Sequence, residues 1–472
     1  MVSSLESGKL AGFGRLDKHL RLFLLLAFVS VMVYLCAPDS YLFEYDCYCF
    51  VQYVLSMILF MRARKKKNFF DFDTIFLIAF LCTFFLYPVF LYPVNPRYFA
   101  VFNYGFSEDV ISKSTALALV GSQMYMFGSL WFQYRPKKPV EQHYRVEFLP
   151  DKIVILLTIL FFVLFLLLGG LNYYRSLYSG DASAQFQQNA AFAYANTLFQ
   201  VFLATSIMLE FNKQLFYNRT APSPGKLNKT FLMFVCMYIP FLLSTGSRGT
   251  TMESLLMLIG LYTLYFKPIK FKWFMLLVLL GALGMTFIAV VRGKGSFEVT
   301  GFIDIFMDLI INNRNTFVAV DYVDENGMSF GVSMLGYILK VIPFAQNLVL
   351  TILGIEPYMA NSALFLTVQT LGHDPTFGLG TNIIADLYLA FGFGGVVFFM
   401  WMGGYLMAKV QYMALHYHVY YMLMYTVFMS FSVYVVRSEF FFSLNALAWS
   451  ACILNVLRHF CKKKKEVAPS EG

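Results

Sequence analysis

The stretch that decides the fold is residues 242–251, LLSTGSRGTT, which joins two apolar runs, Phe231–Leu243 and Met252–Phe266. An arginine between two membrane helices is costly to bury, so we expect Arg248 to lie at a water interface or in a polar cavity. The helix that begins just beyond it offers free N–H groups and the positive end of its dipole. A fixed cation beside a helix N-terminus predicts an anion site, and phosphate is the usual anion. The alternative is a short loop with a solvated arginine.

Composition indicates a polytopic membrane protein and excludes a soluble enzyme. The chain is 59% hydrophobic, 19% aromatic and only 13% charged, with a mean hydropathy of +0.63. The net charge of +9 does not indicate nucleic acid, because the basic residues fall in short runs between apolar spans. The seven Cys lack metal-ligand spacing, and there is no glycine-rich phosphate loop. We therefore expect neither a metal nor a cofactor.

The apolar runs predict an all-α protein with about twelve transmembrane helices and both termini in the cytoplasm. Within the long loop, residues 302–310 and Val332–Leu353 have the pattern of interfacial helices. Span 10 should bend at residues 392–395, where three glycines occur. The expected parts are a cytoplasmic N-terminus (1–21), spans 1–9 (22–291), a large periplasmic loop with interfacial helices (292–380), spans 10–12 (381–457) and a cytoplasmic tail (458–472).

The Asp-Phe-Asp run at residues 71–73 has the form of the Asp-x-Asp motif of nucleotide-sugar enzymes. It lies on the expected inner side, directly before span 3, with no soluble domain around it. We expect Asp73 to cap span 3 instead.

The positive-inside rule leaves nine basic residues unexplained on the outer side, and six of them are arginines. Arginine matches a diphosphate bidentately, which lysine does not. A cation at the end of span 9 is also favoured by the helix dipole, and an Arg437–Glu439 surface pair is a second structural alternative. The nine are Arg97, Lys113, Arg175, Arg248, Arg292, Lys294, Arg314, Lys340 and Arg437.

Candidate acid and base residues also lie on the outer side. His373 is the only histidine expected there, and its ordinary pKa suits a general base. A solvated loop histidine is the alternative. Asp386 and Tyr388 lie one to two turns into span 10. A carboxylate at that depth should face a polar cavity rather than lipid.

Several short motifs together resemble the Wzy type of oligosaccharide repeat-unit polymerase of bacterial envelopes, which includes the O-antigen and enterobacterial-common-antigen polymerases. The resemblance covers roughly residues 230–460 and the twelve-span layout. The motifs are Gly246-Ser247-Arg248, Val291–Gly295, Arg314–Phe317, Asn361-Ser362-Ala363 followed by His373, Gly378–Gly395 and Arg437-Ser438-Glu439.

The resemblance implies a GT-C-like fold and a reaction at the periplasmic face of the bacterial inner membrane. A growing glycan would pass from undecaprenyl diphosphate to the distal sugar of the next lipid-linked repeat unit. The implied diphosphate ligands are Arg248, Arg292, Arg314 and Arg437. His373 is the first choice of base, with Asp374 and Glu439 in reserve.

The implied partners are membrane lipids, undecaprenyl-diphosphate-linked oligosaccharides as donor and acceptor, a chain-length regulator and a flippase. Two alternatives stay open. An O-antigen ligase uses the same donor, and a lipid-linked oligosaccharide flippase would also carry outward cations.

Overall fold

The computed structural model describes residues 17–135, 151–173, 190–217, 228–244, 248–291, 306–375, 377–416 and 418–467, and within these ranges every regular element is a helix. The longer α-helices are α1 (Lys18–Leu35), α2 (Phe43–Ala63), α3 (Phe72–Phe84), α4 (Ile111–Tyr134), α5 (Lys152–Phe165), α8 (Ala190–Tyr217), α9 (Lys229–Ser244), α10 (Arg248–Tyr265), α11 (Phe271–Val291), α13 (Asn313–Asn326), α17 (Ile383–Leu415), α18 (Val419–Ser430) and α19 (Leu444–Val467). The shorter elements are η1 (Tyr87–Leu91), η2 (Ala100–Asn103), η3 (Glu108–Val110), η4 (Leu166–Gly170), α12 (Met307–Ile310), η7 (Val332–Met334), α14 (Leu335–Leu339), α15 (Ala345–Leu353), α16 (Ser362–Leu371) and η8 (Tyr434–Arg437).

Six helical stretches of the described chain are long and apolar enough to cross a membrane. They are Lys18–Leu35, Phe43–Ala63, Phe72–Leu91, Lys152–Tyr173, Ala191–Leu215 and Ile383–Leu415. Large apolar side chains on their outer faces are exposed, such as Leu156 (66%) and Leu167 (79%). Since lipid is as apolar as these side chains, such faces suit a bilayer and not water. The chain is therefore a multi-pass membrane protein.

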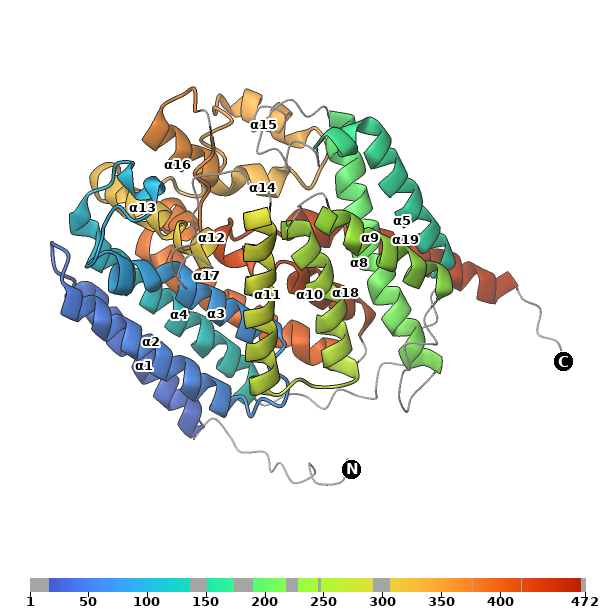
Figure 1. Cartoon of the computed structure of the whole chain (residues 1–472), viewed down its shortest axis with the longest axis horizontal. Coiled ribbons are helices and arrows are strands. Elements are labelled where there is room, and N and C mark those ends of the chain that lie inside the picture. The colour runs from blue at the N-terminus through green and yellow to red at the C-terminus, as the bar shows by residue number, and fades with distance from the viewer. Residues whose placement is uncertain are drawn as a thin grey trace.

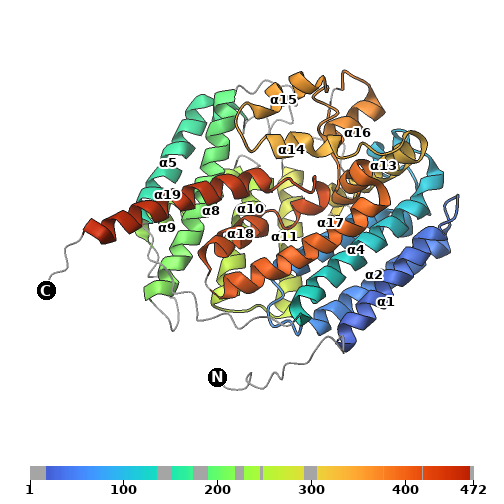
Figure 2. The same ribbon diagram turned by 180° about the vertical axis from the view of Figure 1, so that it is seen from behind.

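Among the described helices, α4 and α17 form the most extensive pairing and lie side by side (Figure 2). A Cβ at Gly404 would lie 2.8 Å from the carbonyl carbon of Tyr125, and one at Gly128 would lie 2.9 Å from that of Trp401. The two backbones therefore touch at reciprocal glycines, as small residues allow in membrane helices. This contact sets the position of α17.

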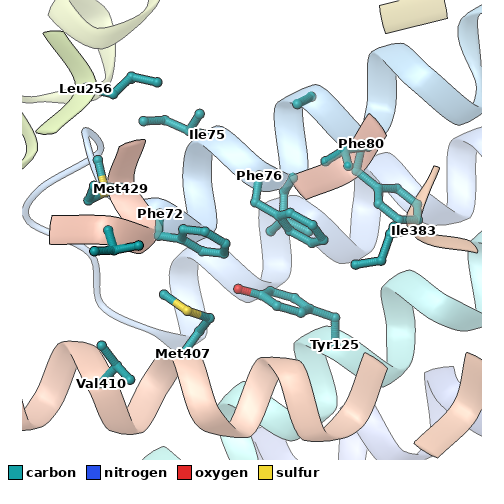
Figure 3. Close-up of a cluster of buried hydrophobic side chains, with 14 of the residues drawn as sticks. Phe72, Ile75, Phe76, Phe80, Tyr125, Leu256, Ile383, Met407, Val410 and Met429 are labelled. Atoms are coloured by element: carbon teal, nitrogen blue, oxygen red, sulfur yellow. The ribbon is translucent and has the colours of Figure 1, made fainter. Parts of the chain in front are cut away.

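Aromatic side chains fill the space between α3, α4 and α17 (Figure 3). Phe72, Phe76 and Phe80 recur every four residues and therefore lie on one face of α3. Phe76 packs on Tyr125 of α4 with ring centres 4.6 Å apart. These side chains are at most 4% exposed, so α3 is held by packing on this face.

α17 bends where the sequence predicts it. Gly392 has φ 62° and ψ −154° inside the helix, a conformation in the region that favours glycine. The bend separates the first turns of α17, which begin at the Asn382 cap and carry Asp386, from the long segment that packs on α4. The prediction of a bent span 10 is confirmed.

The described part of the segment between α11 and α17 folds into α12–α16 at one end of the bundle (Figure 1). The expected helix at residues 302–310 lies partly outside the described residues, and its described part holds the short α12. The expected Val332–Leu353 helix is divided into η7, α14 and α15. Phe344, with φ 65°, and the preceding Pro343 break it.

The expected cap of span 3 is wrong. Asp71, not Asp73, caps α3, because its Oδ1 accepts the Thr74 N–H at 3.0 Å.

Candidate functional site

An apolar cavity of about 520 Å³ lies between α3, α10 and α11, three neighbouring helices in Figure 1. Aliphatic and aromatic side chains form most of its wall. The charged residues of its lining are Arg437 from η8 and Asp308 from α12, which both come from the end of the bundle that carries α12–α16. The cavity therefore combines a long apolar surface with one cationic and one acidic side chain at one end. Its other lining residues include Ile75, Ala79, Met252, Leu256, Ile259, Leu277, Val278, Leu309 and Tyr434.

Arg437 is held in place by two contacts. Its Nη1 donates a hydrogen bond to the Asp308 backbone oxygen at 3.1 Å. Its guanidinium carbon lies 5.2 Å from the centre of the Tyr434 ring, within the range of a cation–π contact. Arg437 stays partly exposed, so the remaining guanidinium donors can reach an anion. The alternative pairing with Glu439 is not formed.

The N-terminus of α10 meets the same tyrosine. Gly249 has no side chain, and the Tyr434 hydroxyl occupies the space where its Cβ would lie. Arg248 is the first residue of α10, so its backbone is next to the tyrosine that supports Arg437. The structure thus brings two of the predicted arginine positions together. The side chain of Arg248 and all of Arg292 lie outside the described residues.

Arg314 is in a different environment, inside α13. It is 0% exposed. Its Nε donates to the Tyr104 backbone oxygen at 3.2 Å and its Nη2 to Thr370 Oγ1 at 2.8 Å. Burial lowers the pKa of Arg314 to about 10, which keeps it charged at neutral pH. The Arg314 side chain therefore joins α13 to α16 and to the loop that contains Tyr104.

His373 and Asp374 follow the end of α16 and are exposed. The His373 ring meets Tyr358 edge to face, with centres 5.4 Å apart. Both side chains lie on the surface at the end of the bundle that carries α12–α16. They share this region with Arg314, since Thr370 contacts that arginine three residues earlier.

Glu439 is buried, with 4% exposure. The Tyr337 side chain and the Ala363 backbone lie close enough to its carboxylate to lower its pKa. Its Oε1 has no hydrogen-bond partner among the described residues. Burial raises the pKa of Glu439 above its ordinary value, and these two groups and the charge of Lys340 offset only part of the rise. A buried carboxylate of this kind is a stronger base than a solvated one.

Asp386 approaches Glu439 from α17 and is 0% exposed. Its Oδ2 accepts the Phe440 N–H, directly after Glu439, at 2.9 Å. The Ser362 hydroxyl lies nearby and donates to Thr381 Oγ1, and Asp386 Oδ1 has no hydrogen-bond partner among the described residues. Two buried carboxyl groups with unpartnered oxygens thus lie together. The sequence predicts a polar surrounding for Asp386, but it does not predict that Glu439 lies beside it.

Three of the short motifs meet at this carboxyl pair. Asn361-Ser362-Ala363, the Gly378–Gly395 stretch and Arg437-Ser438-Glu439 supply its side chains and backbone donors. Tyr337 is the functional candidate that sequence reasoning missed, because it lies within an apolar stretch. Its pKa is raised, first by burial and then by Glu439. Only the tertiary contact distinguishes it from a packing residue.

The carboxyl pair is also close to Arg437. Ser438 between them is extended, with φ −138° and ψ 174°. The Cα atoms of Arg437 and Glu439 are therefore about 7 Å apart. One segment thus supplies both the cation at the apolar cavity and the buried base. With this spacing, a diphosphate at Arg437 and a reacting hydroxyl at Glu439 would both contact the segment Arg437–Glu439.

The Asp-x-Asp run has a structural role at the other end of the bundle. Asp73 pairs with Arg64 at 3.0 Å and Asp71 with Lys66 at 2.7 Å. Both carboxylates are thus neutralised by protein cations. Within the described ranges, no group of three or more His, Cys, Asp and Glu side chains could hold a metal ion.

The comparisons with known proteins agree with the arrangement described above. A family model for the O-antigen polysaccharide polymerase Wzy matches residues 20–465, nearly the whole chain. The comparisons with curated proteins and with solved structures gave no match. The chain belongs to the Wzy family of O-antigen polysaccharide polymerases.

Proposed function

We propose that the protein transfers a growing glycan from undecaprenyl diphosphate to the distal sugar of the next lipid-linked repeat unit. The acceptor hydroxyl attacks the anomeric carbon of the donor. The bond from that carbon to the diphosphate oxygen breaks, and undecaprenyl diphosphate leaves. One observation carries the proposal. A single short segment carries a cation in the wall of an apolar cavity and, two residues later, a buried carboxylate.

The donor carrier suits the apolar cavity. Its walls of aliphatic side chains match a polyprenyl chain, and Arg437 marks the position for the diphosphate. Arg248 and the positive end of the α10 dipole add positive charge beside Tyr434. Charge on the departing diphosphate grows in the transition state, so donors fixed at this position accelerate its departure. Arg292 is proposed as a further ligand from the family resemblance.

Glu439 is the general base in this proposal. It takes the proton of the acceptor hydroxyl on its unpartnered Oε1. Asp386 acts as a positioning residue, because it holds the backbone immediately after Glu439. Tyr337 orients the carboxylate. Deep burial supports Glu439 over the exposed His373 and Asp374, since water competes with an acceptor at an exposed base.

His373 and Asp374 remain candidates for binding acceptor sugar on the outer surface. Arg314 has a bracing role in this proposal, because its hydrogen bonds and complete burial leave little room for a diphosphate. It connects α13 to α16 and to the loop that contains Tyr104. Its loss would then act on the site through the fold.

The topology proposed with this function has twelve spans, cytoplasmic termini and a GT-C-like arrangement in the bacterial inner membrane. The basic turn between α2 and α3 and that between α10 and α11 lie at the end of the bundle away from α13–α16 (Figure 1). The positive-inside rule supports a cytoplasmic location for this end. α12–α16 would then face the periplasm, where the lipid-linked repeat units are joined.

The test uses cells whose polymerase gene is replaced by variants of this chain, with glycan laddering on a gel as readout. Glu439→Gln and Arg437→Ala should abolish the ladder and leave a single repeat on the lipid core. Loss of a general base costs about 10²- to 10⁴-fold in rate. Arg97→Ala removes an exposed cation from the outer region and should preserve the ladder. Protein levels are compared in every strain.

A full ladder in the Glu439→Gln strain would refute the base assignment, and loss of laddering in His373→Ala alone would transfer that role to His373. An empty lipid core in the Arg437→Ala strain would instead indicate that ligation or export is lost. The ligase or flippase alternative would then replace polymerisation.

A further inference from the structure

A second cavity, of about 480 Å³, lies at the end of the bundle away from α13–α16 (Figure 1). The α2–α3 turn, the ends of α4 and α17 and the α10–α11 turn enclose it. Its volume is in the range of small-molecule sites. The lining includes Arg64, Lys65, Lys66, Lys67, Asp71, Phe132, Gln133, Phe266, Gln411, Tyr412 and Leu415.

The floor of this cavity is a closed ion-pair network. Arg64 pairs with Asp73, and Lys66 pairs with Asp71. Gln411 joins the two pairs, accepting from Arg64 at 2.6 Å and donating to Asp71 at 3.3 Å. Two cations are thus balanced by two carboxylates. An anionic ligand would therefore gain no net electrostatic attraction from these four paired side chains.

The uncompensated charge comes from Lys65 and Lys67 at the rim. Both are exposed and neither takes part in the network. Lys65 follows the α2 C-cap residue with φ 48°, in the left-handed region. Glycine is the usual residue at this position after a helix, since a side chain is strained there. A lysine kept at a glycine position points to a role for its side chain.

The turn that carries these lysines is fixed. The Phe69 N–H donates to the Ile269 oxygen at 2.9 Å, and the Ile269 N–H donates to Asn68 Oδ1 at 3.1 Å. These hydrogen bonds join the α2–α3 turn to the α10–α11 turn. The cavity is therefore preorganised, which lowers the cost of ordering on binding.

We propose that this cavity binds the headgroup of an anionic phospholipid, with Lys65 and Lys67 at the phosphate. Two cations match a phosphate-bearing headgroup, and both belong to a turn at the end of a membrane-spanning helix. Phe132, Tyr412 and Leu415 give the cavity an apolar wall for the start of an acyl chain. This inference is independent of the proposed polymerase reaction, because it concerns the opposite end of the bundle.

The experiment measures phosphatidylglycerol binding to the purified full chain by native mass spectrometry, with phosphatidylcholine as the neutral lipid. The test variant is Lys65→Gly with Lys67→Ala, because glycine relaxes the left-handed backbone and keeps the turn foldable. Its apparent Kd for phosphatidylglycerol should rise about thirtyfold, because each lysine near a membrane surface contributes about 1 kcal/mol. Lys270→Ala with Lys272→Ala removes the same charge at the same end, outside the lining. The apparent Kd of this control variant for phosphatidylglycerol should stay within about twofold of the value for the natural protein.

An equal loss in both double variants would overturn the proposal, because it would show general charge attraction at this end. An unchanged Kd in the test variant would also overturn it. Glycerol 3-phosphate is added as a competitor. Displacement of phosphatidylglycerol by a stoichiometric amount of it would indicate a free phosphate ligand and refute the lipid assignment, whereas weak competition supports the lipid.

Discussion

The contact of α4 with α17 predicts sharply different effects of alanine at two adjacent glycines. A Cβ at Gly404 would lie 2.8 Å from the Tyr125 carbonyl carbon, 3.1 Å from the Ser129 nitrogen and closer still to the Tyr125 oxygen. All three are backbone atoms, which cannot rotate away. A Cβ at Gly403 would lie 3.6 Å from the Phe440 ring, an ordinary contact.

The magnitude follows from these contacts. At Gly404 the two helices must separate by about 1 Å to restore van der Waals distances, and overpacking of this kind costs about 1–3 kcal/mol. Alanine also gains up to about 1 kcal/mol over glycine in a helix, at either position. The gain cancels between the two variants, so we expect Gly404→Ala to be less stable than Gly403→Ala by about 1–3 kcal/mol.

The assay is the thermal midpoint of the purified protein in detergent, followed by size-exclusion chromatography after heating. Gly404→Ala should have the lowest midpoint, and Gly403→Ala should equal or exceed the natural protein. Glycan laddering should fall only in Gly404→Ala, because displacement of α17 also moves Asp386. A midpoint for Gly404→Ala at or above that of Gly403→Ala would refute the reasoning.

Three further predictions concern single contacts. Arg64→Ala removes the nearer cation of buried Asp73 and leaves Lys66 at 3.9 Å. The free energy of unfolding should therefore fall, but by less than the roughly 3–5 kcal/mol of a fully unpaired buried charge. Recovery by an added Asp73→Asn is the check, and no recovery would contradict the pairing. Gly249→Ala should displace the Tyr434 hydroxyl and shorten the glycan ladder. An added Tyr434→Phe should restore it, and a double variant as defective as the single would count against the contact. Burial raises the pKa of Glu439 in the folded protein. The protein's free energy of unfolding should therefore fall as the pH rises from the pKa of glutamate in the unfolded chain, about 4.3, through the raised pKa in the folded protein. Glu439→Gln should flatten a plot of thermal midpoint against pH, and curves that stay parallel would show that Glu439 does not titrate this way.

The sequence predicts the class of fold because lipid imposes a simple rule on composition. Apolar runs of sufficient length, such as Lys152–Tyr173, are visible in the sequence and reappear as helices. The bend at Gly392 is predictable for a similar reason, since a glycine cluster inside a span is a local signal. Divided segments such as Val332–Leu353 are harder, because the left-handed backbone at Phe344 that breaks this apolar run has no hydrophobic signal of its own.

The site is predictable only in part because its key relations are between distant segments. The grouping of Arg248 with Arg437 depends on Tyr434 touching Gly249, which no local pattern indicates. Arg314 belongs to the same outer arginines by sequence, yet its burial distinguishes it from Arg437. Tyr337 and Asp386 acquire their importance from Glu439 alone.

The same burial that makes Glu439 costly to the fold makes it useful to the proposed reaction. A solvated carboxylate is a weak base, whereas desolvation increases its affinity for a proton. Asp386 adds a second buried carboxyl group, and two such groups resist simultaneous ionisation. A bound diphosphate at Arg437, about 7 Å along the chain, would add further negative potential near Glu439. The donor would therefore strengthen the base as it binds, so that proton removal from the acceptor becomes favourable only when the leaving group is in place.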